Sequence, residues 1–310
     1  MSRRTFLASS TAAALCAACS SGGSGNRQAA VVSGTDLEPP SSPTITPTPT
    51  AAPTTTPVPT PTPRPAGSEE RTLLAGTPSE TRLVVRHSGV IGPVTMVLGG
   101  VHGNEPGGWL AADEVATWAP AKGSLITIPR SNVQAIASFV RTFEEIGDLN
   151  RLYPGNLESP LLMERMAATI LGVCREFEVS LLLDMHESWA FYAEYPPNSG
   201  TGALGQTITA GPGPVQSDFA QRMAAIANPQ ASTREQFIVR DGTQFGRPTA
   251  TPSASQTTNV RGRSSLSAGG HVPGLTPVLV EMGQTDQPVE RRVALHLITA
   301  RAALSLQGQL

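Results

Sequence analysis

Short apolar runs alternate with stretches of helical spacing between residues 95 and 306. The apolar runs are typical of buried strands and comprise residues 95–98, 125–128, 181–185 and 277–282. The helical patterns comprise residues 109–118, 159–177, 215–227 and 289–306. We expect Ser159 to cap the second of these helices, with Pro160 at its first position. Strands that alternate with helices predict an α/β sandwich around a largely parallel sheet.

Residues 231–274 interrupt this pattern. They show no clear period and are rich in glycine, serine, threonine and arginine. A long irregular stretch inside a compact domain is often functional. We therefore expect these residues, including Arg261, Arg263, Gly269 and Gly270, to line a cleft and to set its specificity.

The first 67 residues differ in composition from the rest of the chain. Residues 1–19 place Arg3 and Arg4 before a short apolar stretch that ends at Cys19, which resembles a twin-arginine export signal with a lipoprotein cleavage site. Eleven of the 28 prolines lie between Pro39 and Pro65, and proline-rich sequence favours an extended linker. We expect an export signal over 1–19, a disordered Ser/Gly and Pro/Thr-rich linker over 20–67, and one folded domain over 68–310.

This arrangement predicts an extracytoplasmic protein, either secreted or tethered to a membrane through lipidated Cys19. The formal net charge of -2, with 15% charged residues, argues against a nucleic-acid partner, which normally leaves a basic footprint. Cys174 is the one cysteine beyond the export signal. Its apolar neighbours indicate a small buried hydrophobic residue rather than a nucleophile.

Polar side chains that can bind metal follow three of the four predicted strands. His102 and Glu105 lie in a glycine-rich turn after residues 95–98, His186 follows 181–185, and Glu281 ends the late strand. Ligands of parallel sheets bind at the carboxyl ends of the strands, where polar groups cost stability unless they are paired or coordinated. Two histidines and one carboxylate leave an open coordination position, which is typical of catalytic zinc. The sequence therefore predicts one zinc ion held by His102, Glu105 and His186.

Four motifs carry a family resemblance in a fixed order. They are GVHGNE at 100–105, DLNRLYPG at 148–155, DMH at 184–186 and VEMG at 280–283. Together they resemble the succinylglutamate desuccinylase/aspartoacylase family of the zinc carboxypeptidase clan. The resemblance implies a zinc-carboxypeptidase-like three-layer α/β sandwich with a mixed, largely parallel sheet, and hydrolysis of an amide bond.

The resemblance also implies a role for each matched residue. The implied roles are zinc ligand (His102, Glu105, His186), support of a ligand imidazole (Asp148), binding of a substrate carboxylate (Asn150, Arg151), polarisation of the scissile carbonyl (Arg141) and general base (Glu281). These roles agree with the chemistry, because zinc lowers the pKa of its bound water to about 7 and an arginine fork binds a carboxylate bidentately.

Two of these roles have competitors in the sequence. Arg130 is an alternative to Arg141, and Glu187 is an alternative to Glu281, although alternation along a strand directs Glu187 away from His186. His271 and His296 are expected to be incidental. The family often has a late tyrosine near its substrate, whereas here no tyrosine follows Tyr195.

The expected activity is therefore that of an exported zinc hydrolase that cleaves an amide bond next to a free carboxylate. A short peptide or a cell-wall peptide is the favoured substrate. A deacylase of small N-acyl amino acids is the alternative enzyme, and a substrate-binding lipoprotein without turnover is the alternative from another class. The retained base Glu281 favours an enzyme.

Overall fold

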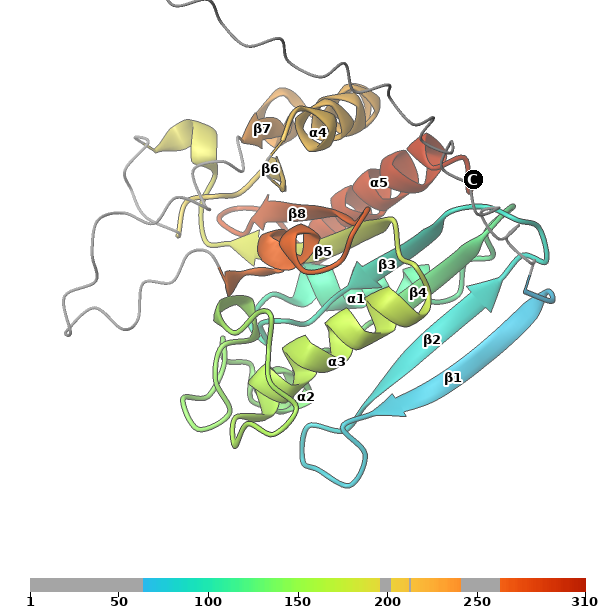
Figure 1. Cartoon of the computed structure of the whole chain (residues 1–310). Coiled ribbons are helices and arrows are strands. Elements are labelled where there is room, and N and C mark those ends of the chain that lie inside the picture. The colour runs from blue at the N-terminus through green and yellow to red at the C-terminus, as the bar shows by residue number, and fades with distance from the viewer. Residues whose placement is uncertain (1–63, 196–201, 212, 241–262) are drawn as a thin grey trace, which may run out of the picture. The chain divides into compact units, whose positions relative to one another are not determined.

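The computed structural model describes residues 64–195, 202–211, 213–240 and 263–310 (Figure 1). The predictions for residues 1–63 and for Arg261 lie outside these ranges. Within them, eight strands form one sheet in the order β1-β2-β4-β3-β5-β8-β6-β7. The strands are β1 (Gly67–Leu73), β2 (Thr81–His87), β3 (Val94–Leu98), β4 (Ser124–Ile128), β5 (Leu181–Ser188), β6 (Thr207–Ala210), β7 (Ile238–Arg240) and β8 (Thr276–Gly283).

The centre of the sheet is parallel and its flanks are not. β4, β3, β5 and β8 run parallel to one another. β2 is antiparallel to β4 on one side, and β6 is antiparallel to β8 on the other. The expected mixed, largely parallel sheet is confirmed. Its four parallel strands place their carboxyl ends at one edge, where ligands of such sheets bind.

Helices cover both faces of the sheet. They are α1 (Pro106–Val115), α2 (Val133–Ser138), α3 (Leu162–Glu176), α4 (Pro214–Ala227) and α5 (Val289–Leu306). Met166 of α3 belongs to a buried cluster with Met96 and Ile126 of the sheet. The helices α1, α4 and α5 contribute to a second cluster around Val97 and Leu183, whose side chains leave the opposite face. The three-layer sandwich predicted from the sequence is therefore confirmed.

The helix boundaries differ from the sequence predictions at two places. The helix expected over 109–118 is α1, which begins at Pro106, and the helix expected over 159–177 is α3, which begins at Leu162. Ser159 does not cap α3. Its hydroxyl accepts from the Leu161 N–H at 3.1 Å and contacts Glu164 Oε2 at 2.6 Å. The Ser159 side chain thus stabilises the turn before the helix.

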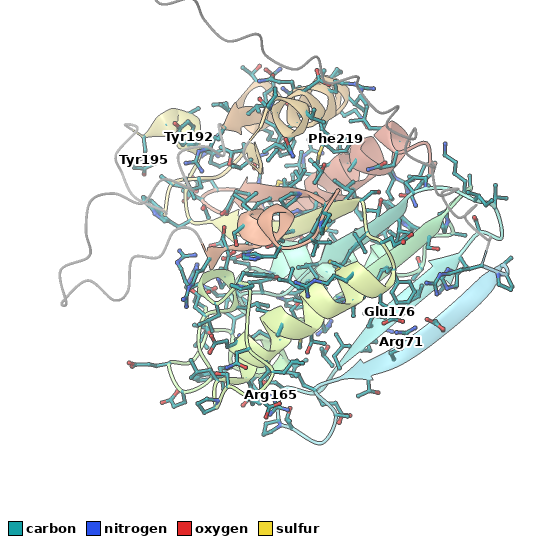
Figure 2. The ribbon with its side chains drawn as sticks, in the orientation of Figure 1. Arg71, Arg165, Glu176, Tyr192, Tyr195 and Phe219 are labelled. Atoms are coloured by element: carbon teal, nitrogen blue, oxygen red, sulfur yellow. The ribbon has the colours of Figure 1, made fainter. Side chains whose placement is uncertain are left out.

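The sequence pattern did not indicate β1, β2, β6 or β7. β1 is largely exposed and has almost no apolar residues, and β7 has three residues. Such strands form because a neighbour supplies their hydrogen bonds. Arg71 of β1 also pairs with Glu176 at the end of α3 at 2.7 Å (Figure 2).

Residues 231–274 contain more regular structure than their sequence suggested. Their described parts include the 3-10 turns Thr233–Glu235 and Ser265–Gly270 as well as β7. Cys174 is buried in the core, as expected, and burial raises the pKa of its thiol to about 12. Among the residues that the structure describes, none of the helices combines the length and apolar character that crossing a membrane requires.

Candidate metal centre and substrate pocket

The pairing of β5 with β8 places His186 beside Glu281. The two residues are direct partners in the parallel register, so their side chains leave the same face of the sheet. Both are almost fully buried, with 1% of His186 and 8% of Glu281 exposed. The Ser188 hydroxyl, two residues after His186, donates to Glu281 Oε2 at 3.1 Å. A carboxylate therefore lies next to the histidine in a site that excludes most water.

The turn between β3 and α1 brings His102 and Glu105 to the same edge. Glu105 is the residue before Pro106, the first residue of α1. Gly103 allows the turn to pass against the chain near α2, because a Cβ at Gly103 would lie 2.0 Å from the carbonyl of Ala135. The expected glycine-rich turn is thus required by close backbone packing as well as by its own geometry.

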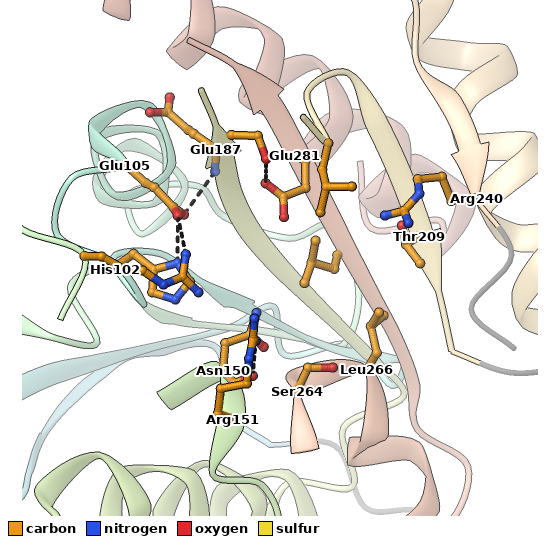
Figure 3. Close-up of a pocket in the computed structure, with 14 residues that line it drawn as sticks. His102, Glu105, Asn150, Arg151, Glu187, Thr209, Arg240, Ser264, Leu266 and Glu281 are labelled. Atoms are coloured by element: carbon orange, nitrogen blue, oxygen red, sulfur yellow. Dashed lines mark hydrogen bonds and ion pairs between the residues drawn. The ribbon is translucent and has the colours of Figure 1, made fainter. Parts of the chain in front are cut away.

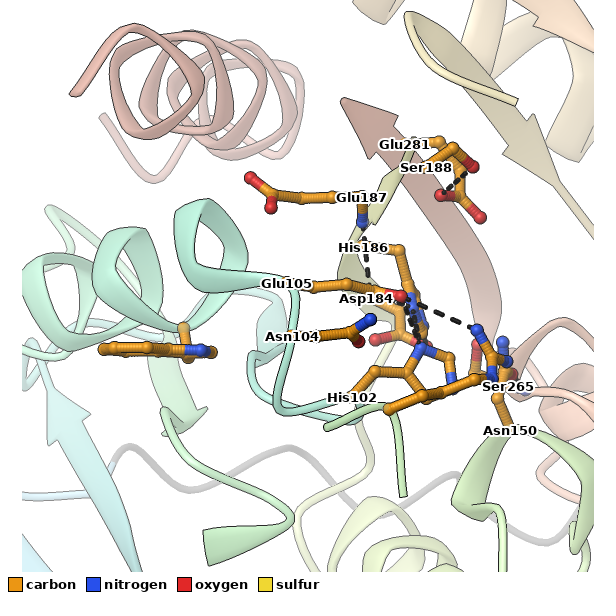
Figure 4. A network of polar contacts seen from close by, with 12 residues as sticks. His102, Asn104, Glu105, Asn150, Asp184, His186, Glu187, Ser188, Ser265 and Glu281 are labelled. Atoms are coloured by element: carbon orange, nitrogen blue, oxygen red, sulfur yellow. Dashed lines mark hydrogen bonds and ion pairs between the residues drawn. The ribbon is translucent and has the colours of Figure 1, made fainter. Parts of the chain in front are cut away.

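The three predicted metal ligands converge on one point (Figure 4). His102 Nδ1 lies 2.7 Å from Glu105 Oε1 and 3.1 Å from His186 Nδ1, and His186 Nδ1 lies 2.9 Å from Glu105 Oε2. The two imidazole nitrogens and the carboxylate are close enough to bind one cation between them. The donor set suits a zinc ion, which favours imidazole nitrogen and carboxylate oxygen.

The other nitrogen of each imidazole faces a second carboxylate. His102 Nε2 lies 3.2 Å from Asp148 Oδ1, and His186 Nε2 lies 3.0 Å from Asp184 Oδ2. Each Nε2 can therefore donate its proton to a carboxylate, which leaves the lone pair of Nδ1 for the convergence point. Sequence reasoning expected Asp148 in this role and missed Asp184. The spacing of two residues in a strand was the available signal, because it puts Asp184 and His186 on one face.

Electrostatics at this point favour a bound cation. Burial opposes ionisation of Glu105, but His102 and His186 lower the pKa of its carboxyl far below the usual range. Burial likewise opposes protonation of His186, but Asp184 and Glu105 raise the pKa of its imidazole. Burial raises the pKa of Glu281 to about 7, against the lowering effect of His186. A carboxylate with that pKa is suited to exchange protons near neutral pH.

Arg141 lies near this centre and Arg130 does not. Arg141 pairs with Asp148 Oδ2 through Nη2 at 3.1 Å, and its Nη1 lies 3.7 Å from Glu105 Oε1. Arg130 pairs with Asp113 at 2.7 Å instead and stacks over Trp109. Between the two arginines that the sequence offered, the geometry favours Arg141.

Asn150 and Arg151 lie in the 3-10 turn Leu149–Arg151, which Asp148 caps by accepting the Asn150 N–H at 2.9 Å. The Asn150 side-chain oxygen accepts from the Ser265 N–H at 3.1 Å, and Arg151 donates to the Asn150 carbonyl at 2.7 Å. Both residues line the same pocket as His102 and Glu281 (Figure 3). The pocket thus contains two of the three predicted ligands, His102 and Glu105, together with the predicted carboxylate-binding pair.

The pocket extends from the metal ligands to the edge of the sheet and encloses about 620 Å³, part of it open to solvent. We call its two parts the metal end (His102, Glu105 and Glu281, with His186 buried directly behind them) and the sheet-edge end (Leu204, Thr209, Arg240, Leu266 and Leu279). Thr209 pairs in register with Arg240 on one side and with Leu279 on the other. These three side chains therefore lie on one face of the sheet. Along β8, Leu279 lies two residues further from the carboxyl end than Glu281 does.

The sheet-edge end was only partly foreseen. Ser264 and Leu266 come from the expected stretch 231–274 and line the pocket, as does Arg240. Arg263, Gly269 and Gly270 are not among the described residues that line this pocket. Thr209 carried no sequence signal, because it belongs to a strand that the pattern did not reveal.

Glu187, the alternative to Glu281, borders the pocket, but its carboxylate lies on the other side of β5. Figure 3 shows the Glu187 side chain directed away from the pocket, and it pairs there with Arg292. Burial raises the pKa of Glu187 to about 7, while Arg292 opposes this shift. His296 of α5 is fully buried, which agrees with a packed histidine, whereas His271 is exposed.

Residues 91–191 match the family model of the succinylglutamate desuccinylase/aspartoacylase catalytic domain. The match contains the turn with His102 and Glu105, the motif at 148–155 and His186, and it ends before Glu281. The family resemblance carried by the sequence motifs is therefore confirmed. None of the curated proteins matches the chain.

Several solved structures resemble this fold. Csd4 from Helicobacter pylori, a D,L-carboxypeptidase in its mDAP-bound form, has 17% identity and a TM-score of 0.57, over 71% of this chain and 52% of Csd4. The ectoine utilization protein EutE (DoeB) from Ruegeria pomeroyi has 18% identity and a TM-score of 0.56, over 81% of this chain and 70% of EutE. An aspartoacylase family protein from Mesorhizobium loti has 19% identity and a TM-score of 0.52, over 79% and 68% of the two chains.

At these identities the likeness shows the fold alone. The fold is that of zinc carboxypeptidase-like and aspartoacylase-like proteins, as the motifs implied. The chain spans about half the length of Csd4.

Proposed function

We propose that this chain is a zinc-dependent hydrolase that removes a residue with a free carboxylate from a short peptide, such as a cell-wall stem peptide. The match of residues 91–191 to the succinylglutamate desuccinylase/aspartoacylase catalytic domain, a family of amide hydrolases, supports this proposal. One observation carries the proposal. The two imidazole Nδ1 atoms and the Glu105 carboxylate meet at one point, in a pocket that also contains Glu281 and Arg151.

His102, Glu105 and His186 would hold one zinc ion. When bound, this ion would supply Lewis-acid chemistry and lower the pKa of water to about 7. Glu281 would accept the proton of the attacking water and return it to the leaving amine, since burial brings its pKa to about 7. Arg141 would stabilise negative charge on the carbonyl oxygen, because its guanidinium lies beside Glu105.

Asn150 and Arg151 would bind the terminal carboxylate of the substrate. An arginine and an amide can give a carboxylate several charge-assisted hydrogen bonds. A substrate held there would direct its next amide bond toward the metal ligands, since Asn150 and Arg151 line one pocket with His102 and Glu105 (Figure 3). Recognition of a free carboxylate favours a carboxypeptidase-like reaction over the cleavage of an internal peptide bond.

The sheet-edge end would receive the side chain of the released residue. Its walls are apolar at Leu204, Leu266 and Leu279, and its far end offers the Thr209 hydroxyl and the Arg240 guanidinium. This combination suits an aliphatic side chain that ends in a carboxylate or another hydrogen-bond acceptor.

A matched pair of peptides tests the proposal. The zinc-loaded protein is incubated with short peptides that differ only in a free or an amidated C-terminus. We expect release of the terminal residue from the free acid and a loss of about 10- to 100-fold for the amide, the cost of charge-assisted hydrogen bonds. Equal cleavage of both peptides would contradict carboxylate recognition, and no cleavage of either would contradict the peptidase reaction.

An N-acyl amino acid in the same assay tests the alternative deacylase. The family match favours this second function, because the family is named for enzymes that remove acyl groups. Turnover of an N-acyl glutamate or aspartate without turnover of any peptide would establish the deacylase. Zinc binding and substrate binding without turnover of any of these compounds would favour the inactive binding protein.

We also propose that the protein acts outside the cytoplasm, as a secreted protein or through lipidated Cys19. The support is the sequence of residues 1–67, with Arg3-Arg4, the short apolar stretch and the proline-rich segment. Replacing Arg3 and Arg4 by lysine should retain the precursor in the cytoplasm. Normal amounts of mature protein outside the cytoplasm would rule out the twin-arginine route.

A further inference from the structure

Glu187 follows the metal ligand His186, yet its side chain leaves the opposite face of β5 (Figure 4). There the Glu187 carboxylate is completely buried and forms an ion pair with Arg292 of α5, whose side chain is 11% exposed. A buried charge is costly unless its partners satisfy it fully. The position of this carboxylate therefore requires an explanation beyond local packing.

Glu187 and its partner Gln284 contact the backbone on both sides of the metal ligand Glu105. Glu187 Oε1 accepts the N–H of Gly107 at 3.0 Å. Gln284, just after β8, donates through Nε2 to Glu187 Oε2 at 3.0 Å and to the carbonyl of Asn104 at 2.9 Å. The backbone is thus held on both sides of Glu105 by one buried carboxylate and its amide neighbour.

The backbone of Glu187 contacts the ligand itself. The Glu187 N–H donates to Glu105 Oε2 at 3.0 Å. This is the same oxygen that lies 2.9 Å from His186 Nδ1. Residue 187 therefore orients the Glu105 carboxylate with its main chain and fixes the adjacent backbone with its side chain.

The fit around this carboxylate is tight. A Cβ at Gly107 would lie 2.1 Å from Glu187 Oε1 and 2.9 Å from Arg292 Cβ. Only a glycine at position 107 lets the first turn of α1 approach the buried carboxylate. Arg292 is held in turn, because its Nε donates to the carbonyl of Gln287 at 3.1 Å.

We propose that Glu187, Gln284 and Arg292 form a clasp that positions the metal ligand Glu105 from the far side of the sheet. Glu187 is then a positioning residue and takes no proton during the reaction. The clasp connects the turn after β3 with β5, with the segment after β8 and with α5, so the elements that carry the metal ligands and the base move as one unit. The inference rests on the metal site proposed above.

Zinc affinity is the direct test. It is measured by competition with a chelator on the folded full chain, for the wild type and for Glu187→Gln, which keeps the shape of the side chain and removes its charge. Groups that orient a metal ligand from behind typically contribute a factor of about 10 to 100 in metal affinity. We expect a loss of that size, with kcat at saturating zinc within about threefold of the wild type.

Glu235→Gln is the matched control. Glu235 pairs at 2.7 Å with Arg291, which precedes Arg292 on α5. Among the described residues, no contact links this pair to the turn that carries His102 and Glu105. We expect its zinc affinity to stay within about twofold of the wild type. Gln284→Met is a milder second variant, because it removes the donor shared by Asn104 and Glu187 but keeps the ion pair of Glu187 with Arg292, and it should lose several-fold in affinity.

The outcomes separate the inference from the proposed function. If the wild type binds zinc and both clasp variants bind it equally well, the clasp is overturned and the metal site stands. If Glu187→Gln keeps its zinc affinity but loses kcat, Glu187 is a base rather than a positioning residue. A wild type that binds no zinc overturns both.

Discussion

The metal end and the sheet-edge end of the pocket are built in opposite ways. At the metal end, every imidazole nitrogen of His102 and His186 has a polar partner within 3.2 Å. At the sheet-edge end, the buried Thr209 hydroxyl has no hydrogen-bond partner among the residues that the structure describes. One end is organised before any ligand binds, and the other offers a group that a ligand can satisfy.

This difference separates chemistry from specificity. Preorganised charges act without reorganisation during a reaction, which is the main electrostatic contribution to catalysis. A buried polar group without a partner costs free energy until a matching ligand group arrives. Substitutions at the metal end should therefore abolish turnover for every substrate, whereas substitutions at the sheet-edge end should change the preference among substrates.

The largest effect is expected for His186→Ala. This change removes one of three ligands and leaves Glu105 and Asp184 with an uncompensated negative charge. We expect loss of bound zinc and of turnover below detection for all substrates. Metal content and hydrolysis are measured on the same preparation. Stoichiometric zinc in this variant would show that the ligand set is wrong.

Glu281→Gln should retain zinc and lose about 10²- to 10⁴-fold in kcat, the usual contribution of a general base. Burial raises the pKa of Glu281 to about 7, so the active, ionised form is lost as pH falls through that value. A bound zinc ion would lower this pKa, since a nearby cation favours the ionised carboxylate. The wild-type kcat/KM should therefore decrease at a pH below about 7, and the pH profile of the variant should lack this limb. An unchanged limb in the variant would assign it to another group.

Arg151→Ala should cost about 10- to 100-fold in kcat/KM, because it removes charge-assisted hydrogen bonds to the terminal carboxylate. Amidation of the peptide removes the same contact, so the two losses should not add. The double comparison needs four rate measurements, two proteins with two peptides. Fully additive losses would mean that Arg151 binds a different part of the substrate.

The smallest effects belong to the sheet-edge end. Arg240→Gln and Thr209→Val should lower kcat/KM by about tenfold for peptides whose terminal residue is glutamate, and by less than twofold when it is norvaline. Arg234→Gln is the control, since Arg234 pairs with Glu194 outside the pocket lining. Equal losses for both peptides would mean that Thr209 and Arg240 do not contact the side chain of the released residue.

The sequence predicted the metal end better than the sheet-edge end for a physical reason. His102, Glu105 and His186 follow strong apolar strands of a parallel sheet, so topology alone brings them to one edge. Thr209 and Arg240 belong to strands of four and three residues. β6 forms by pairing with β8, and β7 forms by pairing with β6. The pattern of apolar residues along the chain does not indicate this pairing.

Asp184 and Glu187 illustrate the same limit within one strand. Alternation along β5 correctly separated Glu187 from His186, and it could also have placed Asp184 behind the ligand. The clasp around Glu187 could not be foreseen, because Gln284 and Arg292 are 97 and 105 residues away along the chain. Their contacts depend on how β8 and α5 pack on the sheet.

An anomalous difference map recorded at the zinc edge, from crystals of the zinc-loaded protein, tests the central claim most directly. We predict one peak about 2.0–2.2 Å from Nδ1 of His102, Nδ1 of His186 and a carboxylate oxygen of Glu105. A peak bound by other residues, or no peak at this point in a protein that hydrolyses amides, would contradict the account.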